Sequence, residues 1–228
     1  MKKIQLYRKL SQLTFLIILI IGFYADIRMV IILALPAAFI FGNFYCGWIC
    51  PFGTLQDLFG LIGRKMFKKK FKMPRPIQKY LQFSRYILAI ISVTGAFSIF
   101  FESINAYGTF LGVFLTPFTL TASSIVMISL VLIAILFDRP YCNYLCSEGI
   151  KFGVFSFTRI FSIKRNEDSC VSCKKCTQAC PMNIEVNIKE NIRNAQCINC
   201  FECISVCPVE NTLTYGRVPF PNIKNFNK

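Results

Sequence analysis

Two cysteine runs of identical spacing occupy residues 170–208. Each run reads Cys-x2-Cys-x2-Cys-x3-Cys-Pro. Three thiolates at this spacing can bind three corners of one iron–sulfur cube, while the fourth reaches the neighbouring cube. The spacing therefore predicts two [4Fe–4S] clusters with interleaved ligands. The first is assigned to Cys170, Cys173, Cys176 and Cys207, and the second to Cys197, Cys200, Cys203 and Cys180.

Zinc and disulfides are the alternative uses of so many cysteines. Structural zinc sites take two cysteine pairs separated by a loop and often include histidine, whereas this chain has 12 cysteines and no histidine. Disulfides suit secreted scaffolds, but ferredoxin-type ligands need reduced thiols and intracellular cluster assembly. The pattern thus favours iron–sulfur clusters and predicts a cytoplasmic C-terminal part.

The rest of the chain is unusually apolar. Hydrophobic residues make up 54% of the sequence, the mean hydropathy is +0.51, and there are 24 phenylalanines. Apolar runs before residue 138 predict a mainly α membrane protein with four transmembrane helices, arranged as two repeated two-helix units. A C-terminal bacterial ferredoxin-like domain with two [4Fe–4S] clusters follows. The expected spans are about 13–24, 29–45, 83–101 and 118–137. The expected domains are 1–146 (four-helix membrane domain), 147–163 (interfacial amphipathic connector) and 164–228 (two-cluster ferredoxin domain).

The net charge of +15 would suit a nucleic-acid-binding protein. However, the basic residues gather beside the apolar runs, chiefly at the N-terminus and within 64–85, where topology and contact with membrane lipid explain them. No nucleic-acid partner is expected. The positive-inside rule then predicts a multi-pass protein of a prokaryotic cytoplasmic (inner) membrane, with both termini in the cytoplasm.

Two further cysteine pairs repeat in the apolar part. Cys46 and Cys50 match Cys142 and Cys146 at a constant offset of 96 residues, and an amphipathic helix is expected after the first pair, over 54–63. Cysteines at i and i+4 share one face of a helix, and two such pairs supply the four thiolates that an iron–sulfur cluster or zinc takes. These four residues predict a third cluster. A redox disulfide and buried apolar cysteines are the alternatives.

The motif Cys46-Gly-Trp-Ile-Cys-Pro51, the second pair at 142–146 and the doubled run together resemble the NapH/NosR-type family of membrane-bound polyferredoxins. The resemblance implies electron transfer between the quinone pool, as menaquinone or ubiquinone, and another iron–sulfur or cytochrome redox subunit of a hetero-oligomeric respiratory complex. The chain departs from the family pattern at Ser147, where proline is usual, and in having no extra domain. The second departure disfavours NosR-like and oxidase-assembly roles.

The sequence has no motif for a substrate-transforming site. Without histidine, a phosphate loop or paired catalytic carboxylates, the expected role is a non-catalytic electron-transfer subunit of a quinol dehydrogenase-type oxidoreductase. A metal-reducing assembly or maturation factor is the alternative, and a redox sensor ranks last. A quinone site is expected at Gln56 and Asp57, close to the third cluster, in preference to an outer segment around Glu102, Asn105 and Tyr107.

Overall fold

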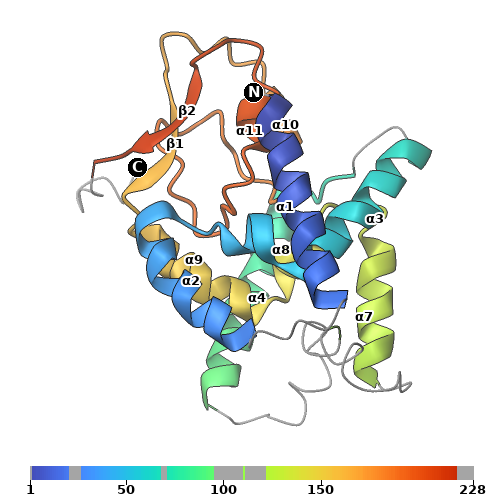
Figure 1. Cartoon of the computed structure of the whole chain (residues 1–228). Coiled ribbons are helices and arrows are strands. Elements are labelled where there is room, and N and C mark those ends of the chain that lie inside the picture. Colours follow the sequence, from blue (N-terminus) through green and yellow to red (C-terminus); the bar gives the residue numbers. More distant parts are fainter. Residues whose placement is uncertain (1, 21–26, 68–70, 95–109, 111–121, 220–228) are drawn as a thin grey trace. The chain divides into compact units, whose positions relative to one another are not determined.

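The computed structural model of the chain describes residues 2–20, 27–67, 71–94, 110 and 122–219 (Figure 1). The chain divides into two compact units, each described here by itself. Unit 1 contains residues 1–10, 25–48 and 151–228, and unit 2 contains residues 11–24 and 49–150. The outer segment with Glu102, Asn105 and Tyr107 lies outside the described residues.

Helices account for most of the described chain. They are α1 (Lys2–Ile20), α2 (Ile27–Phe41), α3 (Pro51–Phe67), α4 (Arg75–Thr94), α7 (Ala122–Ile133), α8 (Pro140–Tyr144), α9 (Ser147–Phe157), α10 (Lys175–Ala179) and α11 (Glu202–Ser205). A π-helical turn, η1, covers Tyr45–Ile49, and two strands, β1 (Phe161–Arg165) and β2 (Leu213–Arg217), complete the set. α3 and α8 each begin at a proline, which is preorganised for the first helical position and has no N–H to leave unpaired there.

The prediction of four transmembrane helices is wrong for the described residues. None of the helices there is at once long enough and apolar enough to cross a bilayer. α2 has 15 residues and α7 has 12, while α1 and α4 include several basic residues. Residues 95–101 and 118–121 of the expected third and fourth spans lie outside the described part. The predicted multi-pass location in a prokaryotic cytoplasmic membrane, with both termini in the cytoplasm, is corrected by the same finding.

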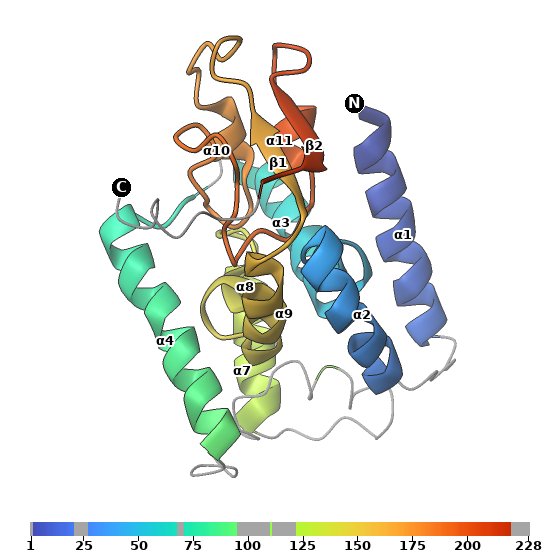
Figure 2. The same ribbon diagram turned by 90° about the vertical axis from the view of Figure 1, so that its left-hand side faces the viewer.

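In unit 1, a two-stranded antiparallel sheet and two short helices frame the doubled cysteine run. β1 pairs with β2 in a register that sets Phe161 opposite Arg217 and Arg165 opposite Leu213. α10 packs against α11, and each of these short helices contains part of one cysteine run. α2 and α9 lie side by side (Figures 1 and 2), and the backbone N–H of Ile160 donates to the carbonyl of Ile40, 3.1 Å away. These contacts join the N-terminal part of unit 1 to the segment that enters the sheet.

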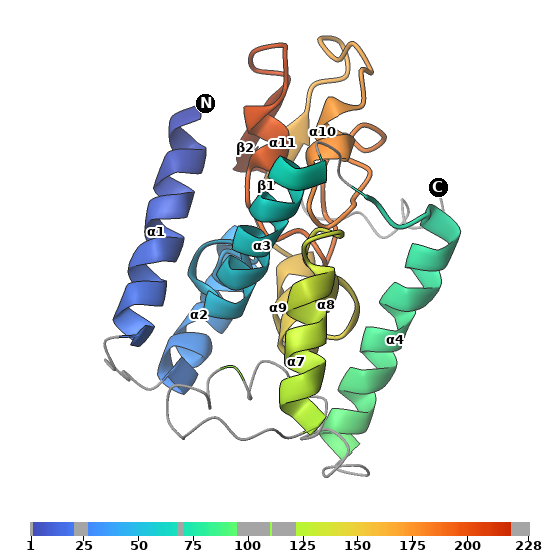
Figure 3. The ribbon, with the colours of Figure 1, turned by 90° about the vertical axis from the view of Figure 1, so that its right-hand side faces the viewer.

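Unit 2 is built on the buried face of α3. Phe52, Gln56, Gly60 and Gly63 recur at helical spacing and are all buried, so they define one side of the helix. α7 packs against α3 and α8, and α8 also packs against α4 (Figure 3). The Phe52 ring meets Tyr141 edge-on with centroids 5.0 Å apart. Glycine at 63 is required because a β-carbon there would collide with the carbonyl of Ile135.

Candidate metal centres

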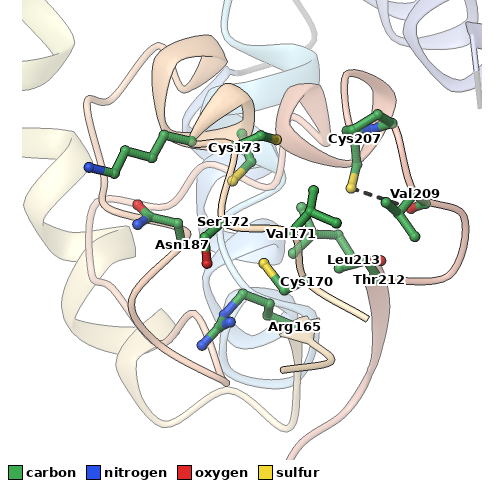
Figure 4. Close-up of a pocket in the computed structure, with 13 residues that line it drawn as sticks. Arg165, Cys170, Val171, Ser172, Cys173, Asn187, Cys207, Val209, Thr212 and Leu213 are labelled. Atoms are coloured by element: carbon green, nitrogen blue, oxygen red, sulfur yellow. Dashed lines mark hydrogen bonds between the residues drawn. The ribbon is translucent and has the colours of Figure 1, made fainter. Parts of the chain in front are cut away.

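Each predicted ferredoxin ligand set lines its own cavity in unit 1. The first cavity, of about 380 Å³ including open solvent, is drawn in Figure 4. Its lining contains the four cysteines assigned to the first cluster: Cys170, Cys173, Cys176 and Cys207. Arg165 and Lys174 also line it, and the Sγ of Cys207 donates to the carbonyl of Val209, 3.4 Å away. Three cysteines of the first run are therefore brought together with the fourth cysteine of the second.

The second cavity, of about 350 Å³ including open solvent, has the reciprocal composition. Its lining contains the four cysteines assigned to the second cluster: Cys180, Cys197, Cys200 and Cys203. All four are buried, and the other lining side chains are apolar. Two cavities of similar size, each holding three thiols of one run and one of the other, fit the donor set that interleaved [4Fe–4S] clusters require.

The backbone repeats between the two runs. Ser172 and Asn199 occupy the same place in their runs and have φ of 50° and 46°, and Lys174 and Phe201 likewise have 58° and 56°. This left-handed region is uncommon for residues other than glycine and costs free energy. Two such residues between successive cysteines turn the chain so that all three cysteines of the run line one cavity. Of the four, only Asn199 is a residue type enriched in this conformation, so residue types alone hardly indicate the turn.

Burial opposes ionisation of several of these thiols. It raises the pKa of Cys180 to about 12 and also raises the pKa of Cys203 and Cys176. The backbone N–H of Ser172 and then the Arg165 side chain lower the pKa of Cys170, which lies nearer the surface. Thiolates are the ligands of iron. At the buried positions a bound positive charge, such as that of iron, is needed to offset the cost of burying a thiolate.

Spacing alone did not identify the N–H groups that donate to the sulfurs of Cys180, Cys146 and Cys142. The backbone N–H of Ile184 lies 3.4 Å from the Sγ of Cys180, and that of Gly149 lies 3.3 Å from the Sγ of Cys146. The side-chain Nε2 of Gln56 lies 3.4 Å from the Sγ of Cys142. Donors of this kind tune the reduction potential of an iron–sulfur cluster.

The four cysteines of the predicted third cluster are all partly buried. Cys46 lies in η1 of unit 1, where its backbone N–H donates to Asn43 Oδ1 at 3.1 Å. Cys50, Cys142 and Cys146 belong to unit 2, and Cys142 lies within α8. Among the residues that the structure describes, no three Cys, Asp or Glu side chains converge as a single metal ion would need. Because each thiolate of a [4Fe–4S] cluster binds a different iron, its ligands do not meet at one point.

Gln56 and Asp57, the predicted quinone residues, both have protein partners in unit 2. Gln56 is fully buried, and its Oε1 accepts from the backbone N–H of Tyr141 at 3.2 Å while its Nε2 faces Cys142. The Asp57 carboxylate forms a bidentate ion pair with Arg139, at 2.7 Å to each oxygen, and also accepts from Gln12. The hydrogen-bond partners of Gln56 and Asp57 lie 45 to 86 residues away in the sequence, so no short motif could have identified these contacts.

Comparison with family models agrees with the chemistry of these sites. Residues 27–74 and 119–164 each match the model described as "4Fe-4S binding domain", and residues 162–208 match the "4Fe-4S dicluster domain". The two copies of the first model contain one predicted third-cluster cysteine pair each. The protein is therefore an iron–sulfur protein. No solved structure matches the chain.

Curated relatives cover most of the chain. YccM of Escherichia coli, named for a proposed role in electron transport, is 32% identical over 80% of this chain, which spans 54% of that protein. An uncharacterised protein of Methanocaldococcus jannaschii is 32% identical, with 83% of this chain and 79% of that protein covered. The ferredoxin-type protein NapH of E. coli is 24% identical over 60% of this chain and 47% of its own length. With its 4Fe–4S domains and with NapH and NosR among its relatives, the chain belongs to the NapH/NosR-type polyferredoxin family.

Proposed function

We propose that this chain relays single electrons through three iron–sulfur clusters between a quinol and a partner redox protein, as a non-catalytic subunit of a hetero-oligomeric complex. The observation that carries the proposal is the lining of the two cavities in unit 1. Each holds three thiols of one cysteine run and one of the other, the donor set of interleaved clusters. When bound, such a cluster takes up and releases one electron at a time.

The third cluster, held by Cys46, Cys50, Cys142 and Cys146, rests on the repeat. Each cysteine pair falls inside one of the two segments that match the 4Fe-4S binding domain. The hydrogen bonds from Gln56 to Cys142 and from Gly149 to Cys146 suit sulfurs that carry negative charge when they bind iron.

Iron content tests the number of clusters. Anaerobically purified protein with three cubes should hold ~12 iron atoms per chain, against ~8 for the ferredoxin clusters alone. Replacing Cys46 and Cys142 together by alanine should remove one cluster's worth of iron and leave the spectrum of the other two. Replacing Cys180 and Cys207 instead should disturb both ferredoxin clusters, because each donates to the cube of the opposite run. An unchanged iron content in the first variant would contradict the third cluster.

The quinol is tested separately. A short-chain menaquinol analogue, added anaerobically in detergent, should reduce the clusters and bleach their visible absorption. Reduction by a ferredoxin or flavodoxin but not by the quinol analogue would keep the relay and remove the quinol from it. Asp57 is one of the two predicted quinone residues. Asp57→Asn is nevertheless unsuitable as the only variant for testing quinol binding, because it also breaks the buried ion pair with Arg139. Gln12→Met, which leaves the Asp57–Arg139 pair in place, is the companion variant.

A further inference from the structure

We infer that residues 171–175, called here the docking segment, form the surface on which an acidic redox protein docks to exchange electrons with the cluster of Cys170, Cys173, Cys176 and Cys207. The inference rests on the proposed function, because it needs a cluster in the first cavity. Beyond that function, it states where electrons pass between the two proteins and what charge the partner has.

The two cavities differ first in exposure. Every residue of the docking segment is exposed, including the ligand Cys173. The second cavity has no such opening among its ligands, since Cys180, Cys197, Cys200 and Cys203 are each no more than 8% exposed. Electron transfer to another protein needs close approach to the cluster. Within unit 1, the ligands of the first cavity offer that approach and those of the second do not.

The cavities differ also in charge. Arg165 and Lys174 line the first, and its lining includes no aspartate or glutamate. Lys175 is exposed beside them. The side chains that line the second cavity are cysteines and apolar residues. Glu167, Asp168, Glu190 and Glu210 are exposed in the same unit, and Glu167 forms an ion pair with Arg165. None of these four carboxylates belongs to the docking segment or lines the first cavity, so Lys174 and Lys175 give this surface its positive charge.

The docking segment also presents an apolar contact. Val171 is 65% exposed although it follows a cluster ligand directly. Its neighbours Ser172 and Lys174 have left-handed backbone conformations, which fix the shape of the segment. Protein interfaces commonly combine an apolar centre with a charged rim. An exposed valine between a cysteine ligand and two lysines has this composition, and a partner rich in carboxylates complements it.

The exchange is a one-electron step. One electron passes between the redox centre of the partner and the cluster, so that one is oxidised as the other is reduced. No covalent bond forms or breaks, and no proton has to move. The lysines act by raising the local concentration of an anionic partner and by orienting it on the exposed ligand.

Two small oxidants of opposite charge test the charge of the surface. Dithionite-reduced protein is mixed in a stopped-flow instrument with tris(oxalato)cobaltate(III), an anion, or with hexaamminecobalt(III), a cation. The double variant Lys174→Glu/Lys175→Glu should slow oxidation by the anion about tenfold at low ionic strength and accelerate oxidation by the cation. The control Lys3→Glu/Lys9→Glu changes two exposed lysines of α1, outside the docking segment and the first cavity, alters the net charge equally, and should change both rates less than twofold.

A binding readout accompanies the rates. Flavodoxin, an acidic one-electron protein, is linked to the iron-loaded chain with a zero-length carbodiimide, and the joined lysines are mapped by mass spectrometry. Links at Lys174 or Lys175 support the docking segment. Links confined to other lysines, or equal rate changes in the variant and its control, overturn it. Full iron content in each variant keeps this result separate from a failure of the proposed function, which would appear as missing clusters.

Discussion

Gly47 packs directly against the backbone carbonyl of Ile198, and a β-carbon at Gly47 would overlap with that oxygen. The contact sets η1, which contains Cys46, against the segment between Cys197 and Cys200. Trp48 Nε1 donates across the same contact to the carbonyl of Asn199 at 3.0 Å. Arg8 Nε holds η1 from α1 by donating to the carbonyl of Gly47 at 3.1 Å. The segment 197–200, which lines the second cavity, therefore packs against η1.

Gly47→Ala should therefore disturb the second ferredoxin cluster more than the first. The added methyl group meets backbone rather than a flexible side chain, so the ligand segment has to move. We expect a loss of about 1–3 kcal/mol in the free energy of unfolding, as for overpacked cores. Iron content and the EPR spectrum of the reduced protein should show a selective loss. Gly216→Ala is the matched control, since nothing lies within 4 Å of a β-carbon there. Equal effects of the two variants would contradict the argument.

Gln56→Met should destabilise unit 2 although it keeps the size of the side chain. It leaves the buried N–H of Tyr141 without its acceptor, which costs about 1–3 kcal/mol. It also removes the donor to Cys142, so the potential of the proposed third cluster should fall, because such donors favour the reduced form. Urea denaturation and a potentiometric EPR titration measure the two effects. Leu61→Met, at an exposed position of α3, should stay within about 0.5 kcal/mol of the original protein.

Asp57→Asn should be among the most damaging single changes to a carboxylate in this chain. It leaves the guanidinium of Arg139, only 1% exposed, buried without its counter-charge, and one-sided loss of a buried pair costs about 3–5 kcal/mol. Glu167→Gln tests the contrast, because Glu167 pairs with Arg165 from an exposed position and such pairs contribute about 0–1 kcal/mol. The two variants are compared by urea denaturation at one ionic strength. A small effect at Asp57 would mean that Arg139 finds another partner.

Tyr215 should make the stability of unit 1 sensitive to alkaline pH. Its hydroxyl donates to the carbonyl of Phe41 at 2.6 Å, and burial raises the pKa of Tyr215 to about 12 from an ordinary value of about 10. Because the folded state holds the proton more tightly, the contribution is complete below pH ~10 and is lost as the pH rises towards ~12. The stability difference between the original protein and Tyr215→Phe should shrink across this window. A difference independent of pH would exclude the titration.

The kind of cofactor was predictable because thiolate spacing encodes it directly. The two cavity linings could be predicted for the same reason, because the fourth cysteine of each run binds the cluster of the other run. The prediction of bilayer spans failed because it placed each span on an apolar run without fixing where the helices begin and end. Among the described residues, α1 begins at Lys2 and so includes the basic N-terminal residues, and α7 covers 12 residues.

Long-range polar contacts were beyond the sequence argument. Asp57 and Arg139 are 82 residues apart in sequence, and no short motif links them. Arg139 also has a φ of 49°, a backbone conformation that arginine rarely adopts. The amphipathic helix expected over 54–63 is longer in the structure. α3 covers Pro51–Phe67, and the Thr54 hydroxyl donates to the carbonyl of Cys50 within the first turn.

In unit 1, N-terminal residues contact residues 158 to 195 positions later in the chain, so these contacts can form only late in translation. Gln5 donates to the carbonyl of Cys200, and the carbonyl of Phe41 accepts from Asn199 and Tyr215, across separations of 158 to 195 residues. The N-terminal partners leave the ribosome long before the cysteines they cover, so unit 1 stays open until the segment up to Tyr215 has been made. Iron and sulfide have to reach Cys180, Cys197, Cys200 and Cys203 in that interval, because the closed unit buries all four. Cluster insertion and chain closure therefore compete in time, and slow delivery of iron would leave a closed unit with an empty second site.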